Sequence, residues 1–280
     1  MNRTIKIEKE SCIKCGKCAQ VCPSGIMVKD QSSKEINLIH PEHCIGCGHC
    51  VDVCPSDSVI HSDFPAEHVH PIDYSQMPNP EQVMLLIKSR RSNRTITSKP
   101  VPQELLEQIV EAARYAPTAT NSRQISFTLI TEPEKLLQIS NYTIGVFNSL
   151  AKLLLNPVVK LLLKPFMQDT YKYVPMFESL KQEHAEGKDP ILRKATALLI
   201  IHTPKSNRFG CEDANLAYQN ASLMAQSLGV SQVYMGFVLT AIKQDSKNMF
   251  NSITGVDGKV QAIMALGMPA FKYPKYVDRL

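Results

Sequence analysis

The chain has 280 residues, of which 44% are hydrophobic and 20% charged, and its formal net charge is +5. This length suits about two domains, and a mean hydropathy of −0.14 excludes both a disordered chain and a multi-span membrane protein. Residues 1–64 carry a net charge of −1 and the remainder +6, but no Lys/Arg run exceeds two residues and Trp is absent, so no nucleic-acid-binding surface is expected. Residues 1–10 mix charged residues and contain no apolar stretch, so we expect no secretory signal peptide and a cytoplasmic location.

Eight of the nine cysteines lie within residues 12–54, in two runs of the form C-x2-C-x2-C-x3-C-P. Segments 12–28 and 44–60 repeat one another at a period of 32 residues. Three thiolates at positions i, i+3 and i+6 of a loop can reach three irons of a cubane cluster, and Gly16 and Gly48 permit the positive φ that such a loop needs. Disulfides are not expected without an export signal, and zinc ribbons use paired rather than triplet cysteines. The spacing therefore predicts two 4Fe–4S clusters.

Residues 1–64 resemble the bacterial 2×4Fe–4S ferredoxins, in which the last cysteine of each run binds the other cluster. The resemblance implies one cluster on Cys12, Cys15, Cys18 and Cys54 and a second on Cys44, Cys47, Cys50 and Cys22. It also implies one-electron transfer at low potential. Because all eight thiolates are then used, His49 is interpreted as a partly exposed loop residue rather than as a ligand or a tuning donor.

Four prolines in residues 65–80 predict an extended linker ahead of a second domain, residues 81–280. In that domain the apolar pattern predicts helices over 81–88, from Pro102 to the turn at Tyr115, and over 212–228, and strands over 126–130, 195–202 and 260–266. The last two strands are nearly all apolar and are expected at the centre of a sheet. No G-x-G-x-x-G follows any strand, so a Rossmann nicotinamide site is not supported.

Arg90, Ser92 and Arg94 alternate along an extended stretch. Both guanidinium groups can therefore point the same way and bind a phosphate, to which Ser92 adds a hydroxyl. The competing interpretation of the Arg90–Arg91 pair is a solvated helix end.

Residues 81–280 resemble the flavin-dependent nitroreductase family. The resemblance is carried, in order, by R-R-S-x-R at 90–94, A-P-T-x-x-N at 116–121, a small-residue helix ending Leu-Gly at 213–229, Gly236, and Gly-x-Pro at 267–269 followed by basic residues. It implies an α+β fold and an intertwined homodimer with FMN at the subunit interface. The fold class expected for the whole chain is thus a small 2×4Fe–4S ferredoxin-like domain followed by an α+β nitroreductase-like domain.

The resemblance also implies which residues bind FMN. The set on the phosphate and ribityl side comprises Arg90, Arg91, Ser92, Arg94, Lys275 and Arg279. The set beside the isoalloxazine ring comprises Pro117, Thr118, Ala119, Asn121, Tyr234, Met235 and Gly236. Arg123-Gln124-Ile125 replaces the family's frequent Gln-Pro-Trp, which leaves the ring contacts there open. No catalytic acid or base is predicted, because the flavin supplies the hydride chemistry. Cys211 is expected to be buried at a helix start rather than reactive.

Residues 143–168 form an unusually apolar insertion in which Asn148, Lys152, Asn156, Lys160 and Lys164 recur every four residues as one stripe of a helix. The longest uncharged run between its lysines is far below the roughly twenty residues of a membrane span. Three interpretations stay open, namely a helix covering the core, a mobile lid over a substrate pocket, or a contact with a membrane surface. Pro157 is expected to kink the helix.

The two parts together predict an iron–sulfur flavoprotein oxidoreductase. The clusters would pass single electrons to FMN, and a small nitroaromatic, quinone-like or unsaturated acceptor would be reduced by two-electron transfer. The expected donor is a low-potential, ferredoxin-like protein. Two alternatives are a component that relays electrons between a ferredoxin and a partner protein, and a flavin reductase that uses NAD(P)H and has the clusters as its outlet.

Overall fold

The computed structural model describes residues 3–279, apart from the side chain of Leu163. It divides into two compact units, the first formed by Met1–Pro78 with the short segment Ala119–Ser122, and the second by Asn79–Thr118 and Arg123–Leu280. The proline-rich segment after residue 64 groups with the first unit, and two 3-10 turns, Ala66–His68 and Tyr74–Gln76, interrupt its extended course.

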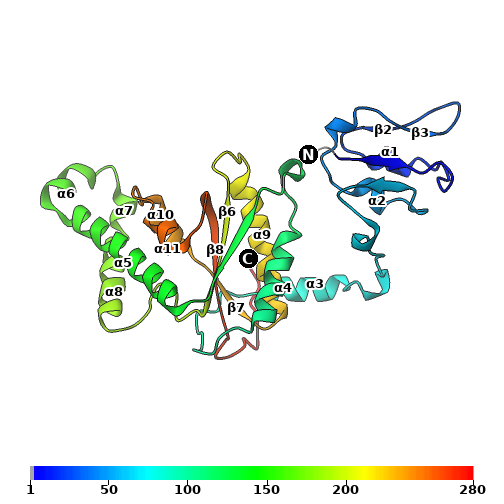
Figure 1. Cartoon of the computed structure of the whole chain (residues 1–280). Coiled ribbons are helices and arrows are strands. Elements are labelled where there is room, and N and C mark those ends of the chain that lie inside the picture. The colour runs from blue at the N-terminus through cyan, green and yellow to red at the C-terminus, as the bar shows by residue number, and fades with distance from the viewer. Residues whose placement is uncertain (1–2, 280) are drawn as a thin grey trace. The chain divides into compact units, whose positions relative to one another are not determined.

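The first unit consists of two small antiparallel sheets and two short helices (Figure 1). Strand β1 (Ile5–Ile7) pairs with β4 (Val59–His61), and β2 (Met27–Lys29) pairs with β3 (Ile36–Leu38). Each cysteine loop leads into a helix, α1 (Lys17–Val21) in the first repeat and α2 (His49–Asp52) in the second. The apolar core is small and includes several of the cysteines, so the unit depends on more than hydrophobic burial.

A glycine precedes each of these helices because the backbone there is left-handed. Gly16 has φ 84° and Gly48 has φ 82°. A Cβ atom on Gly48 would also lie 3.3 Å from the ring of Phe64. The repeated glycine is therefore required by the way each loop enters its helix.

The second unit is built on a four-stranded antiparallel sheet in the order β5-β6-β8-β7. The strands are β5 (Ser126–Ile130), β6 (Ala197–Thr203), β7 (Ser231–Tyr234) and β8 (Lys259–Gly267). All seven residues of β6 are buried, which confirms the central position predicted for the apolar strands. Strand β7 was not predicted.

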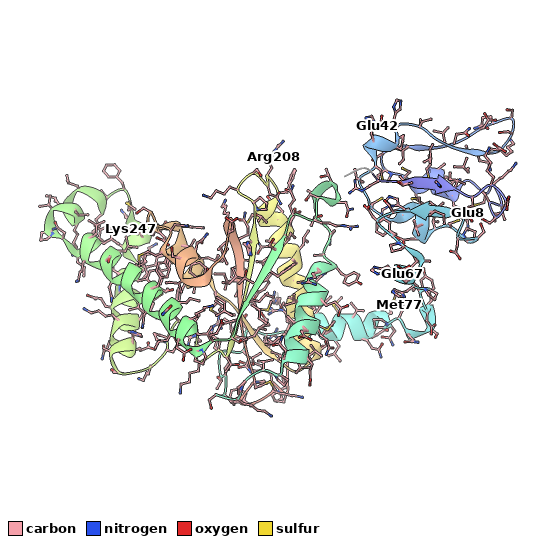
Figure 2. All side chains as sticks on the ribbon, viewed as in Figure 1. Glu8, Glu42, Glu67, Met77, Arg208 and Lys247 are labelled. Atoms are coloured by element: carbon pink, nitrogen blue, oxygen red, sulfur yellow. The ribbon has the colours of Figure 1, made fainter. Side chains whose placement is uncertain are left out.

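Nine helices surround or extend from this sheet within the described residues. They are α3 (Pro80–Ser89), α4 (Gln103–Arg114), α5 (Pro133–Leu155), α6 (Pro157–Leu163), α7 (Gln168–Tyr171), α8 (Val174–Ala185), α9 (Gly210–Ser227), α10 (Gly236–Lys243) and α11 (Met249–Thr254). Helix α3 starts at a capping box in which Asn79 and Gln82 satisfy each other's main-chain N–H groups. Pro102 is the N-cap of α4 rather than its first helical residue. Figure 2 places Arg208 at the turn before α9 and Lys247 between α10 and α11.

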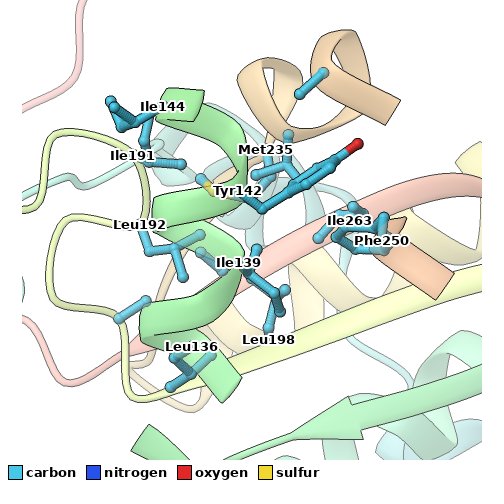
Figure 3. Packing of buried hydrophobic residues seen from close by; sticks show 14 of the residues in the cluster. Leu136, Ile139, Tyr142, Ile144, Ile191, Leu192, Leu198, Met235, Phe250 and Ile263 are labelled. Carbon is cyan, nitrogen blue, oxygen red and sulfur yellow. The ribbon is translucent and has the colours of Figure 1, made fainter. Parts of the chain in front are cut away.

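Helices cover both faces of the sheet. Neighbouring residues of β6 point to opposite faces, so each face contributes side chains to its own hydrophobic cluster. Leu199 and Ile201 pack with residues of α4 and α9 in one hydrophobic cluster. Leu198 and Ile200 pack in a second cluster with residues of α5, α8, α10 and α11, part of which is seen in Figure 3. The second unit is thus a three-layer α+β structure.

The apolar insertion has two structurally different halves. Phe147, Ala151 and Leu154 of α5 are buried, so this half covers the core, as one of the three interpretations predicts. Asn156 then has an extended backbone and its side chain accepts from the N–H groups that start α6, so Pro157 begins a new helix rather than kinking one. Beyond it, Leu161 is 78% and Phe166 87% exposed in this chain. No helix within residues 3–279 is both long and apolar enough to cross a membrane.

Replacing Ile200 with alanine is expected to lower the free energy of unfolding of the second unit by about 2–5 kcal/mol. Ile200 is fully buried, and it pairs with Thr128 of β5 and Ile263 of β8, so neighbouring strands hinder collapse of the cavity. Leu161→Ala is the matched control and should change that free energy by less than about 0.5 kcal/mol, because the side chain is exposed. Denaturant unfolding followed by circular dichroism measures both variants, and equal effects would contradict the expectation.

Candidate cluster and cofactor sites

Four cysteines from distant parts of the sequence line one cavity of the first unit. They are Cys12, Cys15, Cys18 and Cys54. None of the nine cysteines, all of which are described, forms a disulfide. Within residues 3–279 no three His, Cys, Asp or Glu side chains converge on a single-ion site. Four cysteines around one cavity match the number of thiolate ligands that a 4Fe–4S cluster takes.

Main-chain N–H groups point at sulfur atoms of both predicted cysteine sets. The N–H of Ser58 donates to Cys54 Sγ at 3.3 Å, and the N–H of Gly46 donates to Cys44 Sγ at 3.3 Å. Burial alone would raise the pKa of Cys54, but the N–H groups around it lower that pKa overall. These donors favour the thiolate form, which is the form that binds iron.

The second cysteine loop is more deeply buried. Burial, followed by the nearby Cys47, raises the pKa of Cys50 to about 11 in the absence of metal. Cys44 and Cys22 are half-buried and pack at the edge of the core of the first unit. A bound cation would oppose this effect by stabilising the thiolate.

A histidine that the sequence analysis did not consider lies at this loop. The ring of His61 is 2% exposed, and its Nε2 is 3.5 Å from Cys44 Sγ. Burial lowers the pKa of His61, so the ring favours the neutral form. His49, by contrast, is exposed at the start of α2. Because His61 lies 17 residues from Cys44 and outside the cysteine motif, no local pattern marks it.

In the second unit, the extended segment that follows α3 is fixed by a buried hydrogen-bond chain. Ser92 forms a parallel bridge with Gln232 of β7, whose side-chain amide donates to the main-chain carbonyl of Arg91 at 3.2 Å. The hydroxyl of Tyr218 in α9 donates to the carbonyl oxygen of the same amide at 2.7 Å. Gln232 is 1% exposed, so both bonds are protected from water. These hydrogen bonds set the position of the backbone that carries Arg90 and Arg94.

Tyr218 also contacts Tyr234. Burial raises the pKa of Tyr218, and the positive charge of Arg90 opposes that rise. The rings of Tyr218 and Tyr234 meet edge to face at 4.8 Å. The Tyr234 hydroxyl donates to Asn215 Oδ1 at 3.2 Å. Tyr218 and Asn215 were missed by sequence reasoning because only the fold brings α9 to the end of β7.

Arg91 lies elsewhere. Its guanidinium donates to the carbonyls of Lys88, at 3.0 Å, and of Arg90, at 3.2 Å. Together with Lys275 it lines a cleft of about 480 Å³ that Arg90, Ser92 and Arg94 do not line. Arg91 is therefore the least suited of the arginine segment to share one anion with Arg90.

The remaining predicted residues of the phosphate side are near the surface. Arg94 is exposed and reaches only the carbonyl of Ser92, at 3.5 Å. Arg279 is exposed in the final segment. The side-chain amide of Asn93 donates to the carbonyl of Phe271 at 3.1 Å and so ties that final segment to the arginine segment.

The ring-side residues fall into two groups. Met235 is buried, and Gly236 begins α10 with no atom within 4 Å of the place a Cβ would occupy, so a flat group can approach the backbone there. Pro117 is exposed, and the hydroxyl of Thr118 accepts from the N–H of Arg123 at 3.0 Å.

Ala119 and Asn121 form a 3-10 turn in the segment that is compact with the first unit. There Asn121 donates to the carbonyls of Ile45 and Gly46, at 3.1 and 2.8 Å. Cys211, which was expected to be buried, is exposed because it lies on the solvent-facing side of the first turn of α9.

Replacing Gln232 with leucine is expected to destabilise the second unit by about 1–3 kcal/mol. The change removes the partner of the Tyr218 hydroxyl and of the Arg91 carbonyl, and leucine cannot replace either bond. Tyr218→Phe is the matched control, because it removes only the Tyr218 hydroxyl and keeps the bond from the Gln232 amide to the Arg91 carbonyl. Hydrogen exchange at residues 90–94 reports the local effect, and unchanged protection in Gln232→Leu would contradict the role assigned to this amide.

Comparisons with known proteins agree with this architecture. The model of the nitroreductase family matches residues 87–268, and that of the 4Fe–4S dicluster domain matches residues 4–58. The chain is 27% identical over 157 residues to the FMN reductase [NAD(P)H] of Bacillus subtilis, which covers 56% of this chain and 55% of that protein. It is 25% identical over 159 residues to an NADPH-dependent oxidoreductase of Staphylococcus saprophyticus, covering 56% of this chain and 53% of that protein. The chain thus spans about half the length of these curated relatives.

Solved structures show the same fold. The crystal structure of a nitroreductase with bound FMN from Bacteroides fragilis matches with a TM-score of 0.53 and 24% identity, covering 70% of this chain and 95% of that one. At this identity the likeness concerns the fold of the second unit alone.

Proposed function

Because the chain belongs to the nitroreductase family and carries a 4Fe–4S dicluster domain ahead of the family domain, we propose that it is an FMN- and iron–sulfur-dependent oxidoreductase that takes up single electrons at its clusters and reduces a small organic acceptor. The acceptor class we infer is nitroaromatic, quinone-like or unsaturated. The observation that carries the proposal is the presence, in one chain, of two four-cysteine sets and a fixed arginine segment at the end of a buried strand.

We assign one cluster to Cys12, Cys15, Cys18 and Cys54 and the other to Cys44, Cys47, Cys50 and Cys22. The common cavity of the first set and the main-chain donors at Cys54 and Cys44 support this assignment. Exchange of the last cysteine would link the two halves of a unit whose apolar core is small.

The residues at the end of β7 fit FMN. Arg90 and Ser92 lie on a backbone held by Gln232, so a phosphate would meet a guanidinium and a hydroxyl whose positions are set before binding. Arg94 and Arg279 are exposed and free to complete the phosphate site, and the open backbone at Gly236 leaves room for a ring. When bound, FMN would supply the conversion between one-electron and two-electron transfer.

We further infer a homodimer. Helix α3 has no buried residue, although Met84 is 50%, Leu85 57% and Ile87 46% exposed. An apolar helix face of this kind is stabilised when a second copy covers it.

A second candidate differs in the direction of electron flow. Both curated relatives are named for NADPH or NAD(P)H use, which favours a nicotinamide as the reductant and the clusters as the outlet. An electron relay between a ferredoxin and a partner protein is the third possibility, and it predicts no turnover with small acceptors.

The deciding experiment is anaerobic reduction of the protein loaded with FMN and reconstituted with iron and sulfide. Flavin bleaching is followed with NADPH, NADH or a reduced ferredoxin, in the native chain and in the Cys12→Ser/Cys44→Ser variant. The proposal expects bleaching by ferredoxin that the variant loses. Equal bleaching of both proteins by a nicotinamide would establish the second candidate, and a chain that holds iron but never binds FMN would refute both.

A further inference from the structure

The two cysteine loops repeat one another in sequence but not in their surroundings, and His61 makes the difference. Its Nε2 lies 3.5 Å from Cys44 Sγ in the second loop. The ring is 2% exposed and stacks at a tilt on Phe64, with ring centroids 4.9 Å apart. Its backbone is held in β4 opposite Ile5 of β1. The strand and the ring of Phe64 therefore hold the imidazole beside the sulfur.

The proton position on this ring follows from its other nitrogen. The main-chain N–H of Asp63 lies 3.0 Å from Nδ1. A main-chain N–H can only donate, so Nδ1 accepts and carries no proton. In the neutral ring the proton is then on Nε2, and it points at Cys44 Sγ.

The first loop has no such donor. At the repeat period, the positions equivalent to Cys44 and His61 are Cys12 and Lys29. The stem of Lys29 lies over Gly16, where a Cβ would approach its Cδ to 2.8 Å. Within residues 3–279 no side chain is hydrogen-bonded to Cys12 Sγ.

The donors at the first set of cysteines are main-chain N–H groups, which gather at Cys54, and one hydroxyl. Cys54 Sγ accepts from the N–H of Ser58, with the N–H groups of Ser56 and Val59 also acting on it, and Cys44 Sγ accepts from the N–H of Gly46. The Ser56 hydroxyl is 3.8 Å from Cys54 Sγ and is also 2.8 Å from Ser58 Oγ, where it has a better partner. Among the described residues, what distinguishes the second set is a donor from a buried side chain, the imidazole of His61.

The ion pair of Arg3 and Asp63 does not account for the difference between the two cysteine sets. The guanidinium of Arg3 donates to the carbonyl of Cys44 at 2.7 Å, and it also binds the carboxylate of Asp63 at 2.6 Å. The two opposite charges lie together, so their combined field at the loop is small compared with that of a lone arginine.

We propose that the hydrogen bond from His61 to Cys44 makes the cluster of the second loop the easier of the two to reduce, so that a single electron entering the pair rests there. Reduction adds one electron to the cluster, makes and breaks no bond, and leaves the proton on Nε2. A donor at a ligand sulfur stabilises the more negative, reduced cluster more than the oxidised one. The inference rests on the proposed cluster ligands and adds the order in which the two clusters are reduced.

The test is a redox titration of the full reconstituted chain, followed by electron paramagnetic resonance. The native protein should show two one-electron steps. In His61→Leu the higher step should fall, with about a tenfold change in the ratio of reduced to oxidised cluster, which corresponds to about 59 mV. His61→Gln, which keeps an N–H donor, should restore part of the shift. Unchanged steps in His61→Leu would overturn the inference.

Two further variants assign the effect to a cluster. His49→Leu changes an exposed histidine next to Cys50, and both steps should stay in place. Cys47→Ala should leave one cluster, which titrates at the lower step and does not respond to His61→Leu. If the remaining cluster titrates at the higher step, the order is the reverse of the one inferred.

A measurement on the native protein covers the case in which His61→Leu fails to hold its clusters. Pulsed electron paramagnetic resonance of protein labelled with 15N-histidine should detect a histidine nitrogen at one of the reduced clusters. Absence of that coupling would overturn the inference alone, since the clusters are present. Absence of the clusters themselves would instead count against the proposed function.

Discussion

FMN should bind about 10- to 100-fold more weakly when Arg90 is replaced by leucine, because a charge-assisted hydrogen bond to a phosphate is worth about 1.5–3 kcal/mol. Arg90 is half-buried, close enough for its charge to act on Tyr218, and attached to a backbone that Gln232 fixes. A guanidinium held in this way loses little conformational entropy when it binds an anion. The measurement is a titration of the apoprotein with FMN, followed by quenching of flavin fluorescence.

Arg91→Leu is the matched control for this prediction. It removes the same charge one residue away, but its guanidinium is bound to the carbonyls of Lys88 and Arg90 and faces a different cleft. We expect FMN affinity to change less than about threefold, which is the weak, screened effect of a charge outside the site. A larger loss in Arg91→Leu than in Arg90→Leu would show that the phosphate lies in that cleft instead.

Replacing Cys50 with alanine is expected to reduce the iron content from about eight to about four atoms per chain and to unfold the first unit locally. Cys50 is buried in a small core that is partly built from cysteines. Few apolar contacts therefore stabilise the loop once a cluster ligand is lost. The second unit has its own two hydrophobic clusters and should stay folded. Iron analysis together with limited proteolysis measures both effects.

Cys211→Ala provides the control for the loss of a thiol. Cys211 is exposed in α9 and belongs to neither cysteine run. Its replacement should leave iron content and protease resistance unchanged. Cleavage of Cys50→Ala within the second unit as readily as within residues 3–78 would contradict the independence of the two cores.

The predicted elements were most accurate where one local signal dominates. The strands at 126–130, 195–202 and 260–266 and the helix ending before Gly229 are present, because long apolar runs and a glycine stop determine them without help from distant residues. Strand β7 was missed, since Ser231 and Gln232 are polar and only their burial against β8 reveals them as strand residues.

Predictions from the local sequence were wrong where contacts with other residues determine the structure. Pro157 was expected to kink a helix, but Asn156 offers its side chain as an N-cap, and a new helix costs less than a distorted one. Cys211 was expected to be buried because cysteine usually is, but the face of α9 on which it lies points to solvent.

The sequence by itself determined the chemistry of the first unit and the family of the second. Cysteine spacing is a local property, since in this ferredoxin pattern three ligands of each cluster come from one short loop, and the order of the family motifs can be read without a structure. The positions of His61 at Cys44 and of Tyr218 and Gln232 at the arginine segment were decided only by the tertiary structure. These contacts join residues far apart in the chain, and only the folding of the strands and helices sets their distances and excludes water from them.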